Sequence, residues 1–564
     1  MEALDWLVIG VFFLALIGII VWVVRQKQND SADYFLGGRD ATWLAIGASI
    51  FASNIGSEHL IGLAGAGASS GMAIAHWEIQ GWMILILGWV FVPFYSRSMV
   101  YTMPEFLERR YNPQSRTILS VISLVSYVLT KVAVTVYAGG LVFQQVFGIK
   151  ELWGIDFFWI AAIGLVVLTA LYTIFGGMKS VLYTSVLQTP ILLLGSLIIL
   201  VLGFKELGGW DEMMRVCGAV TVNDYGDTMT NLIRSNDDAN FPWLGALIGS
   251  AIIGFWYWCT DQFIVQRVLS GKNEKEARRG TIFGAYLKLL PVFLFLIPGM
   301  IAFALHQKYI GAGGEGFLPM LANGTANADA AFPTLVAKLL PAGVKGLVVC
   351  GILAALMSSL ASLFNSSAML FTIDFYKRFR PETPEKKLVG IGQIATVVIV
   401  ILGILWIPIM RSVGDVLYTY LQDVQSVLAP GIAAAFLLGI CWKRTSAQGG
   451  MWGLIAGMII GLTRLGAKVY YSNAGEVADS TFKYLFYDMN WLFFCGWMFL
   501  FCIIVVIVVS LATEAPTAEK IQGLVFGTAT KEQKAATRAS WDHWDIIHTV
   551  IILAITGAFY WYFW

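Results

Sequence analysis

The stretch Ala48–Gly71, ASIFASNIGSEHLIGLAGAGASSG, lies between apolar segments yet is dense in polar residues. Its polar side chains near the middle are Ser49, Ser53, Asn54, Ser57, Glu58 and His59. Gly56 lies among them, and glycine weakens a helix by about 1 kcal/mol relative to alanine. Lipid cannot satisfy the backbone groups that a break sets free, so a break here must line a polar cavity. An unwound helix in a bilayer offers carbonyl oxygens to a cation and side chains to a polar solute. We therefore expect this stretch to form the core of a binding site.

The composition is that of a polytopic membrane protein. Hydrophobic residues make up 58% of the chain, charged residues 13%, and the mean hydropathy is +0.72. A net charge of +1 gives no reason to expect nucleic acid as a partner. No nucleophile–base pair or phosphate-binding loop stands out, so we do not expect an enzyme.

We predict an all-α polytopic membrane protein with about 14 transmembrane helices. The apolar spans are 5–24, 41–72, 79–99, 116–147, 155–176, 181–204, 242–268, 279–306, 338–376, 388–410, 415–441, 449–470, 490–512 and 546–563. With the N-terminus outside, the loops that fall inside hold 24 of the 37 lysines and arginines. This asymmetry follows the positive-inside rule.

The spans also suggest an internal repeat. After an N-terminal extra helix and loop (1–40), a first group of five spans covers 41–204 and a second covers 242–442, with an extracellular loop (205–241) between them. An odd number of helices in each group forces the two to have inverted topology, as in many secondary transporters. The C-terminal helices (443–564) include a cytoplasmic loop, 513–545.

Ionisable residues inside a membrane are costly and are functional candidates by default. Here they are Glu58, His59, Glu78, Lys131, Asp261, Lys288 and Asp423. Four separate helices contribute Glu78, Lys131, Lys288 and Asp423, which favours one shared polar cavity. Ion pairs that lock neighbouring helices together are the alternative.

Two further clusters point to a polar solute and a cation. Gln422 and Gln425 supply amides, and Phe255–Trp258 supplies aromatic rings that can cover a sugar ring, although such rings also pack cores. In Ala355–Ser367, ALMSSLASLFNSS, the serine hydroxyls are hard oxygen ligands of the kind sodium takes. Small residues in a helix also allow close packing, which is the alternative.

At these residues the chain resembles the sodium/solute symporter family, and within it the sodium–glucose cotransporter branch. The similarity runs from DYFLGGR (Asp33–Arg39) to FLLGICWKR (Phe436–Arg444). Its most specific parts are FASNIGSEHLIGLAGAG, WYWCTDQFIVQR, GAYLKLLP, and SSLASLFNS followed by DFYKRF. The resemblance implies the inverted-repeat, LeuT-like core of sodium-coupled amino-acid transporters, and alternating access around one central site.

The resemblance also implies roles for individual residues. The sodium ligands would be the carbonyls of Ala52, Ile55 and Ala355 and the hydroxyls of Ser358 and Ser359. The solute would be bound by Asn54, His59, Glu78, Lys131, Tyr257, Trp258, Lys288 and Gln422. The gates would be Leu63, Trp77 and Tyr418 outside and Tyr257 inside.

Two departures from the family pattern bear on stoichiometry. Members coupled to a second sodium tend to carry an acid where Ser185 stands here, and a hydroxyl where Ala361 stands. Both changes remove oxygen ligands, so we expect one sodium per solute. The expected function is sodium-coupled symport of a monosaccharide in the plasma membrane, or in the inner membrane of a bacterium. The alternatives are myo-inositol, another polyol or a sialic acid as solute, and a sugar-gated sensor or channel without coupled uptake.

Overall fold

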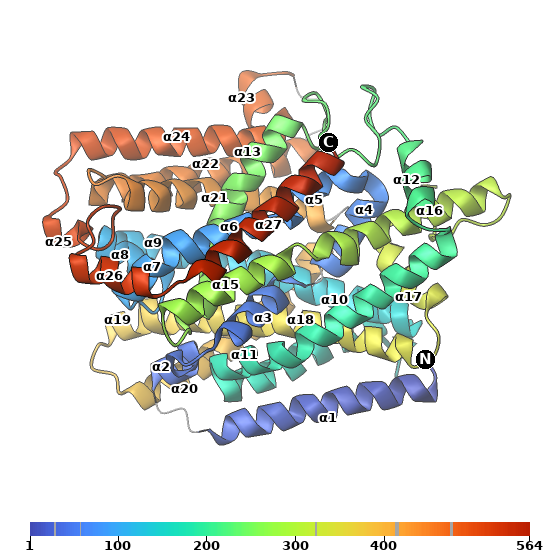
Figure 1. The fold of residues 1–564 in the computed structure, drawn as a ribbon, viewed down its shortest axis with the longest axis horizontal. Helices are drawn as coiled ribbons and strands as arrows, with labels where there is room; N and C mark the ends of the chain where they lie inside the picture. The colour runs from blue at the N-terminus through green and yellow to red at the C-terminus, as the bar shows by residue number, and fades with distance from the viewer. Residues whose placement is uncertain (27–29, 57, 322–323, 412–416, 474–477) are drawn as a thin grey trace.

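The chain folds almost entirely into helices, which Figure 1 shows running mostly along one direction. A computed structural model describes residues 1–26, 30–56, 58–321, 324–411, 417–473 and 478–564. Within these ranges the sheet structure is one antiparallel pair of two-residue strands, β1 (Glu151–Leu152) and β2 (Ile155–Asp156). The predicted helical class is confirmed.

The long helices lie where the apolar spans were predicted. In the described part of the chain, 11 helical runs are long and apolar enough to cross a bilayer. Three interrupted segments account for the difference from 14. Predicted spans 155–176 and 181–204 share α11 (Phe157–Leu207), which Gly177 interrupts at φ +52°. Spans 41–72 and 116–147 are divided into shorter helices.

Many α-helices are short because 3₁₀ or π-helical turns divide the spans. In the first half of the chain the α-helices are α1 (Ala3–Arg25), α2 (Ser31–Leu36), α3 (Trp43–Asn54), α4 (Ala64–Ser70), α5 (Ala75–Glu78), α6 (Gly81–Ile86), α7 (Val92–Ser98), α8 (Met103–Arg110), α9 (Pro113–Ser126), α10 (Ala133–Phe147), α11, α12 (Trp210–Gly218), α13 (Trp243–Gly254), α14 (Gln262–Leu269) and α15 (Glu274–Lys288). In the second half they are α16 (Ile297–Gly311), α17 (Ala331–Leu339), α18 (Val344–Met369), α19 (Lys377–Phe379), α20 (Glu385–Arg411), α21 (Leu417–Cys441), α22 (Ala447–Asn473), α23 (Thr481–Lys483), α24 (Trp491–Ala512), α25 (Ala518–Ile521), α26 (Lys531–Ala539) and α27 (His543–Tyr562).

Tighter or wider helical turns join these helices. The 3₁₀ turns are η1 (Gly37–Arg39), η3 (Gly71–Ile74) and η8 (Ala328–Ala330). The π-helical turns are η2 (Glu58–Leu63), η4 (Leu87–Phe91), η5 (Tyr127–Val132), η6 (Phe255–Thr260), η7 (Val292–Leu296), η9 (Leu370–Tyr376) and η10 (Tyr484–Asp488). Such turns are frequent at functional sites, because they leave backbone groups or side chains out of the regular helical pattern.

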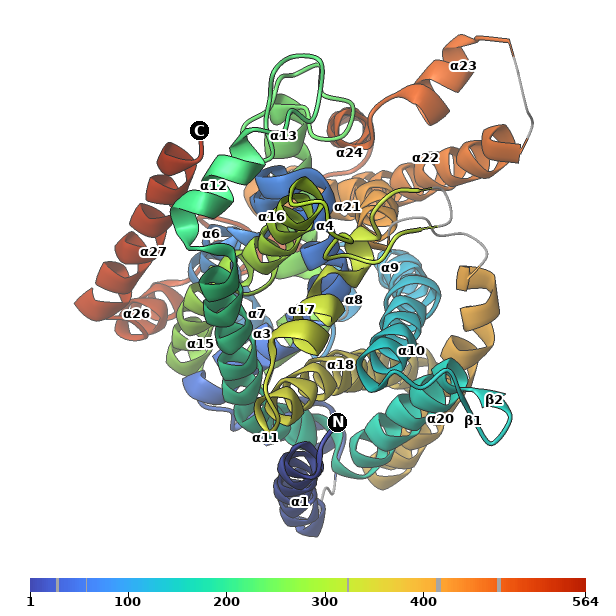
Figure 2. The same ribbon diagram turned by 90° about the vertical axis from the view of Figure 1, so that its right-hand side faces the viewer.

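Burial separates a central group of helices from a peripheral one. In the most apolar window of Val344–Phe379, 89% of the residues are buried, against 22% in α1 and in α27. Figure 2 shows α1 and α27 at the edge of the molecule and α4, α17 and α18 within it. A helix that is buried on all sides belongs to a core, whereas α1 and α27 present most of their apolar surface to lipid.

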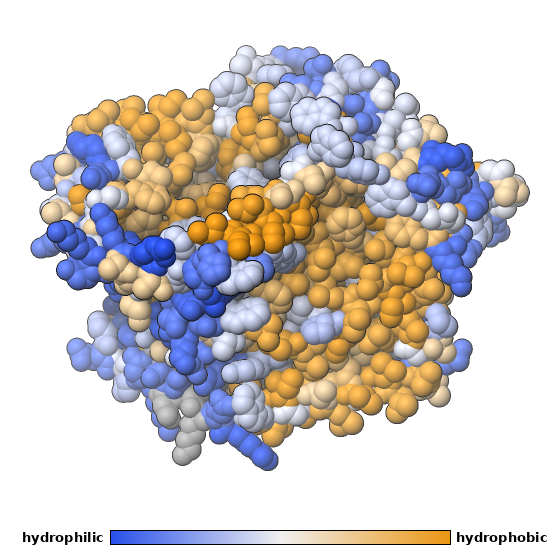
Figure 3. All heavy atoms as spheres, in the orientation of Figure 1, coloured by the Kyte–Doolittle hydropathy of each residue, from blue (hydrophilic) through white to orange (hydrophobic). Residues whose placement is uncertain are grey.

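The surface has the layering of a membrane protein. Figure 3 shows a broad hydrophobic zone, with hydrophilic residues gathered toward the two ends of the helices. Figure 1 shows the N-terminus on the side of the molecule opposite α25 and α26. The hydrophobic zone is where acyl chains would cover the protein.

Candidate functional site

The helix α3 ends where the sequence predicts a break. Ile55 donates its N–H to the Phe51 carbonyl at 2.9 Å and leaves the helix with φ −81° and ψ 107°. Helical structure resumes at Glu58, as the π-helical turn η2. Gly56 lies in this gap, and a Cβ there would approach the Ser359 hydroxyl to 2.9 Å. The predicted discontinuity at Asn54–Gly56 is confirmed.

The break packs against α18 through a serine hydroxyl. Ser359 of α18 donates to the Ser53 carbonyl at 3.0 Å and lies 3.1 Å from the Ile55 carbonyl. Ser53 Oγ lies 2.7 Å from Ser362 Oγ, one turn further along α18. Carbonyl oxygens at the break therefore lie next to hydroxyl oxygens of a neighbouring helix, and hard cations take oxygen ligands.

The other predicted sodium ligands, Ala52, Ala355 and Ser358, belong to the same two helices, α3 and α18. Ser358 Oγ is 3.3 Å from Ser185 Oγ of α11. Ala52 and Ala355 are buried in α3 and α18, two helices that pack against each other. The Ser53 carbonyl, which the sequence analysis did not include, lies closer to Ser359 than the Ile55 carbonyl does.

A cavity lies beside the break, and residues of both α3 and η2 line it. All eight side chains predicted to bind the solute line it: Asn54, His59, Glu78, Lys131, Tyr257, Trp258, Lys288 and Gln422. These residues come from η2, η5, η6, α3, α5, α15 and α21, which are far apart in the sequence. The predicted binding residues are therefore brought together in one place.

A chain of polar contacts crosses the cavity wall. Lys288 Nζ donates to Glu78 Oε2 at 2.6 Å, and His59 Nε2 lies 3.3 Å from the same oxygen. Asn54 Nδ2 lies 3.4 Å from His59 Nε2. Other polar atoms of lining residues are buried and have no hydrogen-bond partner among the described residues: His59 Nδ1, Trp77 Nε1 and Gln422 Oε1. Buried polar atoms of this kind are suited to a ligand that can both donate and accept hydrogen bonds.

Lys131 lines the cavity, but its ammonium group is paired elsewhere. Lys131 Nζ lies 2.7 Å from Asp261 Oδ2, and the Tyr127 hydroxyl donates to the other carboxylate oxygen. The ammonium also lies 4.6 Å from the Tyr257 ring centre and 4.5 Å from that of Phe263. Lys131 thus connects η5 to the end of η6 and lies against the ring of the predicted inner-gate tyrosine.

The expectation that four charged residues share one cavity is wrong for Asp423. It pairs with Lys468 of α22 and is not among the cavity-lining residues, unlike Glu78, Lys131 and Lys288. For Asp423 the alternative of an ion pair between neighbouring helices is therefore the right one. Its helix, α21, packs against α22, which carries Lys468.

The predicted gating residues are packed against aromatic rings or buried. The Trp77 ring stacks on Trp491 at 5.5 Å, and the Tyr257 ring meets Trp258 edge-on at 4.9 Å. Leu63 is fully buried in η2. The side chain of Tyr418 lies outside the described residues.

Two polar lining residues, Gln80 and Thr135, escaped the sequence analysis. Gln80 Nε2 donates to the Ser250 carbonyl at 2.7 Å, and Gln80 Oε1 accepts from Trp258 Nε1 at 3.3 Å. Gln80 thus orients a tryptophan of the cavity wall. Its sequence signal was an amide two residues after Glu78 in an apolar span.

Comparison with known proteins identifies the family. A family model described as the sodium:solute symporter family matches residues 34–457. The chain belongs to the sodium:solute symporter family. This symporter is 37% identical over 542 residues to sodium/myo-inositol cotransporter 2 of Mus musculus, covering 94% of the chain and 80% of the relative. It is 35% identical over 560 residues to sodium/glucose cotransporter 4 of Danio rerio, covering 96% and 84%.

A solved structure supports the fold. A sodium-coupled sialic acid symporter in a substrate-bound, outward-open state superposes with a TM-score of 0.72, at 22% identity, covering 92% of this chain and 99% of that one. The predicted symporter family and sodium as the co-transported ion are confirmed. The chain is a multi-pass membrane symporter that couples sodium to a solute.

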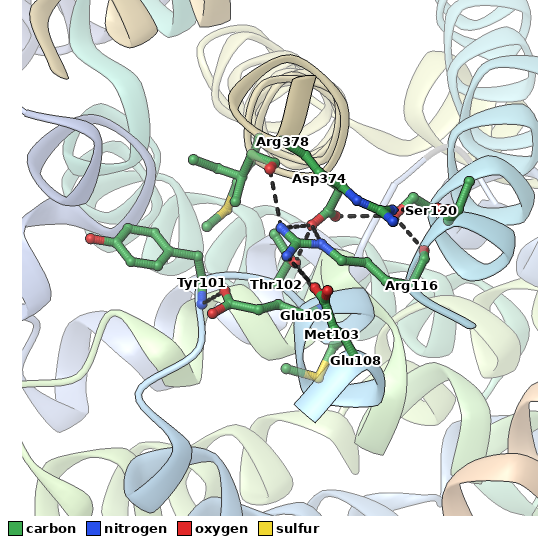
Figure 4. Close-up of polar contacts among 12 residues, drawn as sticks. Tyr101, Thr102, Met103, Glu105, Glu108, Arg116, Ser120, Asp374 and Arg378 are labelled. Carbon is green, nitrogen blue, oxygen red and sulfur yellow. Dashed lines mark hydrogen bonds and ion pairs between the residues drawn. The ribbon is translucent and has the colours of Figure 1, made fainter. Parts of the chain in front are cut away.

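On the side of α25 and α26, this symporter has a second buried polar network, shown in Figure 4. Asp374 of η9 accepts from Arg116 of α9 at 2.7 Å, from Thr102 at 2.8 Å and from Ser120 at 3.1 Å. Arg116 also pairs with Glu108 of α8 at 2.6 Å. The network ties α8 and α9 to the end of the helix that carries Ser358 and Ser359.

Replacing Arg116 by methionine should lower the stability of the symporter markedly. Asp374 would lose its cation while remaining buried, and breaking such a pair costs about 3–5 kcal/mol. We expect a clear fall in the apparent melting temperature of the purified protein in detergent. Arg215→Met is the matched control, because Arg215 pairs with Glu212 on the solvent-exposed α12 and should leave the melting temperature unchanged. Equal melting temperatures for the two variants would contradict this role of Arg116.

Proposed function

We propose that this symporter carries a neutral, polyhydroxylated solute, a monosaccharide of the glucose or galactose type, together with sodium. One observation carries the proposal: the break after α3 serves both ligands. Its Ser53 and Ile55 carbonyls contact the Ser359 hydroxyl, while the side chains of Asn54 and His59 line the cavity. A sodium ion that orders the break therefore also completes the solute site.

The polar groups of the cavity favour a sugar-like solute. Each sugar hydroxyl both donates and accepts a hydrogen bond. Gln422 Oε1 offers an acceptor and Trp77 Nε1 a donor, and each is buried without a partner among the described residues. The rings of Tyr257 and Trp258 supply the flat apolar wall that the face of a sugar ring can cover.

The charges of the cavity favour a neutral solute over a sugar acid. Both lysines that line it are already paired with carboxylates, Lys288 with Glu78 and Lys131 with Asp261. A sialic acid would bring a carboxylate with no unpaired lysine among the described lining residues to receive it. The second candidate solute is myo-inositol, a neutral ring polyol, because relatives similar over most of the chain are named as myo-inositol cotransporters.

The finer topology belongs to the same proposal. We place the N-terminus outside and assign 41–204 and 242–442 to two inverted five-helix repeats, flanked by N- and C-terminal helices. Phe563, near the end of the chain, bonds to Leu232 in the loop 205–241, which this topology places outside like the N-terminus. This contact supports an even number of crossings, such as the 14 predicted. The plasma membrane, or the inner membrane of a bacterium, is the expected location.

The coupling is energetically sufficient with one sodium per solute. A tenfold sodium gradient supplies ~1.4 kcal/mol and a membrane potential of 100 mV adds ~2.3 kcal/mol. Together they can sustain a solute gradient of roughly several hundredfold. We expect one sodium ion per solute because Ser185 and Ala361 leave fewer oxygen ligands for a second cation.

Uptake into proteoliposomes tests this function. With an inward sodium gradient we expect accumulation of radiolabelled glucose, galactose or myo-inositol, and little of sialic acid. The sodium activation curve should have a Hill slope near one, and a potassium gradient should give no accumulation. Sodium currents gated by sugar without accumulation would instead indicate a sensor or channel and overturn the proposal.

A further inference from the structure

The side chains of the one-turn helix α5 point to two different places. Trp77 and Glu78 line the solute cavity. Their neighbour His76 is buried outside the cavity, between an extracellular segment and the C-terminal helix α27. Its Nε2 lies 3.1 Å from the Leu232 carbonyl, and its Nδ1 lies 2.9 Å from the Tyr560 hydroxyl.

These two contacts determine the direction of both hydrogen bonds. A carbonyl can only accept, so His76 carries its proton on Nε2 and donates it to Leu232. In the neutral imidazole the other nitrogen is then an acceptor, and the Tyr560 hydroxyl donates to Nδ1. Both ring nitrogens are thus satisfied by groups from outside the helices that form the cavity.

The backbone around α5 depends on the same outside elements. Gly71 turns the chain at φ +68°, so the segment that follows lacks the support of a continuous helix. Met72 donates its N–H to the Met229 carbonyl at 2.7 Å, and Arg234 donates to the Ser70 carbonyl. The extracellular segment that supplies these groups therefore holds 70–76 in place.

The extracellular segment is in turn joined to the end of the chain. Leu232 donates its N–H to the Phe563 carbonyl at 3.0 Å, so this one residue bonds both to His76 and to the residue after α27. Leu232, His76, Tyr560 and Phe563 form a closed ring of contacts, which we call the α5 clasp. It joins three parts of the sequence that are otherwise separate.

The other end of α27 is fixed to the helix that carries Lys288. Asp542 and Asp545 pair with Arg279 of α15 at 2.7 and 3.0 Å, and Tyr286 contacts His548 at 3.0 Å. Figure 1 shows α27 crossing α15 and α6 on the outside of the bundle. One peripheral helix thus braces both partners of the Glu78–Lys288 pair.

We propose that Tyr560, acting through His76, is a positioning residue for the solute site. The α5 clasp sets the rotation of α5 and so the placement of Trp77 and Glu78 in the cavity. This inference rests on the proposed function and extends it, because it makes the end of α27 a determinant of solute affinity.

The test compares Tyr560→Phe with Tyr562→Phe. The first removes only the hydroxyl that reaches His76; the second removes a hydroxyl that contacts Trp210 at the exposed surface of the same helix end. For Tyr560→Phe we expect the half-saturating solute concentration in proteoliposome uptake to rise about fivefold, as the loss of one buried hydrogen bond implies. The maximal rate and the sodium activation at saturating solute should stay unchanged, and Tyr562→Phe should match the wild type.

A double variant, Tyr560→Phe combined with His76→Phe, separates positioning of the solute site from general stability. Because both groups make the same hydrogen bond, Tyr560→Phe should add nothing to the effect of His76→Phe. An unchanged half-saturating concentration in Tyr560→Phe, or equal losses of rate and affinity that add to those of His76→Phe, would overturn the inference while leaving the proposed function intact.

Hydrogen–deuterium exchange gives a reading that does not depend on transport. We expect the peptide covering 70–78 to exchange faster in Tyr560→Phe than in the wild type, and the peptide covering 491–512 to be unchanged. If wild-type protein accumulates no tested polyol, the proposed function fails, and this exchange difference still decides whether the α5 clasp holds the segment. If the peptide covering 70–78 exchanged equally fast in the wild type and in Tyr560→Phe, the α5 clasp would not hold this segment and the inference would be overturned.

Discussion

Replacing Glu78 by glutamine should weaken solute binding about a hundredfold or more, the largest loss expected from a single substitution in the cavity. Glu78 accepts from Lys288 at 2.6 Å and lies 3.3 Å from His59 Nε2, and all three side chains are buried. Glutamine removes the charged acceptor that the cavity offers to solute hydroxyls and that orients Lys288 and His59. Hydrogen bonds to a charged group are worth about 1.5–3 kcal/mol each, and each 1.4 kcal/mol corresponds to a factor of about ten. Solute binding to purified protein at saturating sodium measures the effect directly.

A double variant separates the site from the fold. In Glu78→Gln, Lys288→Met no buried charge remains unpaired, and apolar replacement of a buried ion pair is often neutral for stability. We therefore expect the melting temperature to return close to that of the wild type while uptake stays absent. Recovery of transport together with stability would show that the pair only supports the helices and does not contact the solute.

Replacing Ser359 by alanine should raise the sodium concentration for half-maximal uptake about tenfold or more, while solute affinity at saturating sodium changes little. The substitution removes a hydroxyl that contacts both the Ser53 and Ile55 carbonyls, and the loss of one buried polar interaction is worth about 1–3 kcal/mol. Sodium-dependent uptake and the reversal potential of the coupled current are the measurements.

Ser367→Ala is the control for this experiment. Ser367 is a buried serine on the same helix, and its hydroxyl has no hydrogen-bond partner among the described residues. Its removal should leave the sodium activation curve as it is. If Ser359→Ala gave the same curve as Ser367→Ala, the cation would have to bind away from the break.

The sequence was most informative where polar residues interrupt apolar ones. A glycine next to Asn54 and His59 in a bilayer setting predicts a break, because neither the backbone nor the side chains could be satisfied in lipid. The same reasoning predicted that Glu78 and Lys288 share a cavity, and the structure places both in its wall. Such predictions succeed because the cost of an unsatisfied group in a membrane is large compared with helix propensity.

The sequence could not predict which residues of distant helices pair with each other. Asp423 has the same local signature as Glu78, yet it pairs with Lys468, because the neighbours of α21 are decided by packing. His76 and Tyr560 are 484 positions apart, and neither lies in a sequence pattern that predicts contact with the other. The individual role of each cavity residue, including Lys131, stays a prediction.

The bend at Asn54–Gly56 also limits how the cargo of this carrier can be redesigned. The Ser53 and Ile55 carbonyls flank Asn54, and His59 follows four positions after Ile55, so a substitution that reshapes one set displaces the other. Attempts to engineer a new cargo by changing the bend would alter ion preference at the same time. Gln422 and Trp258, which line the cavity from α21 and η6, are better positions at which to vary specificity, because they lie outside the bend.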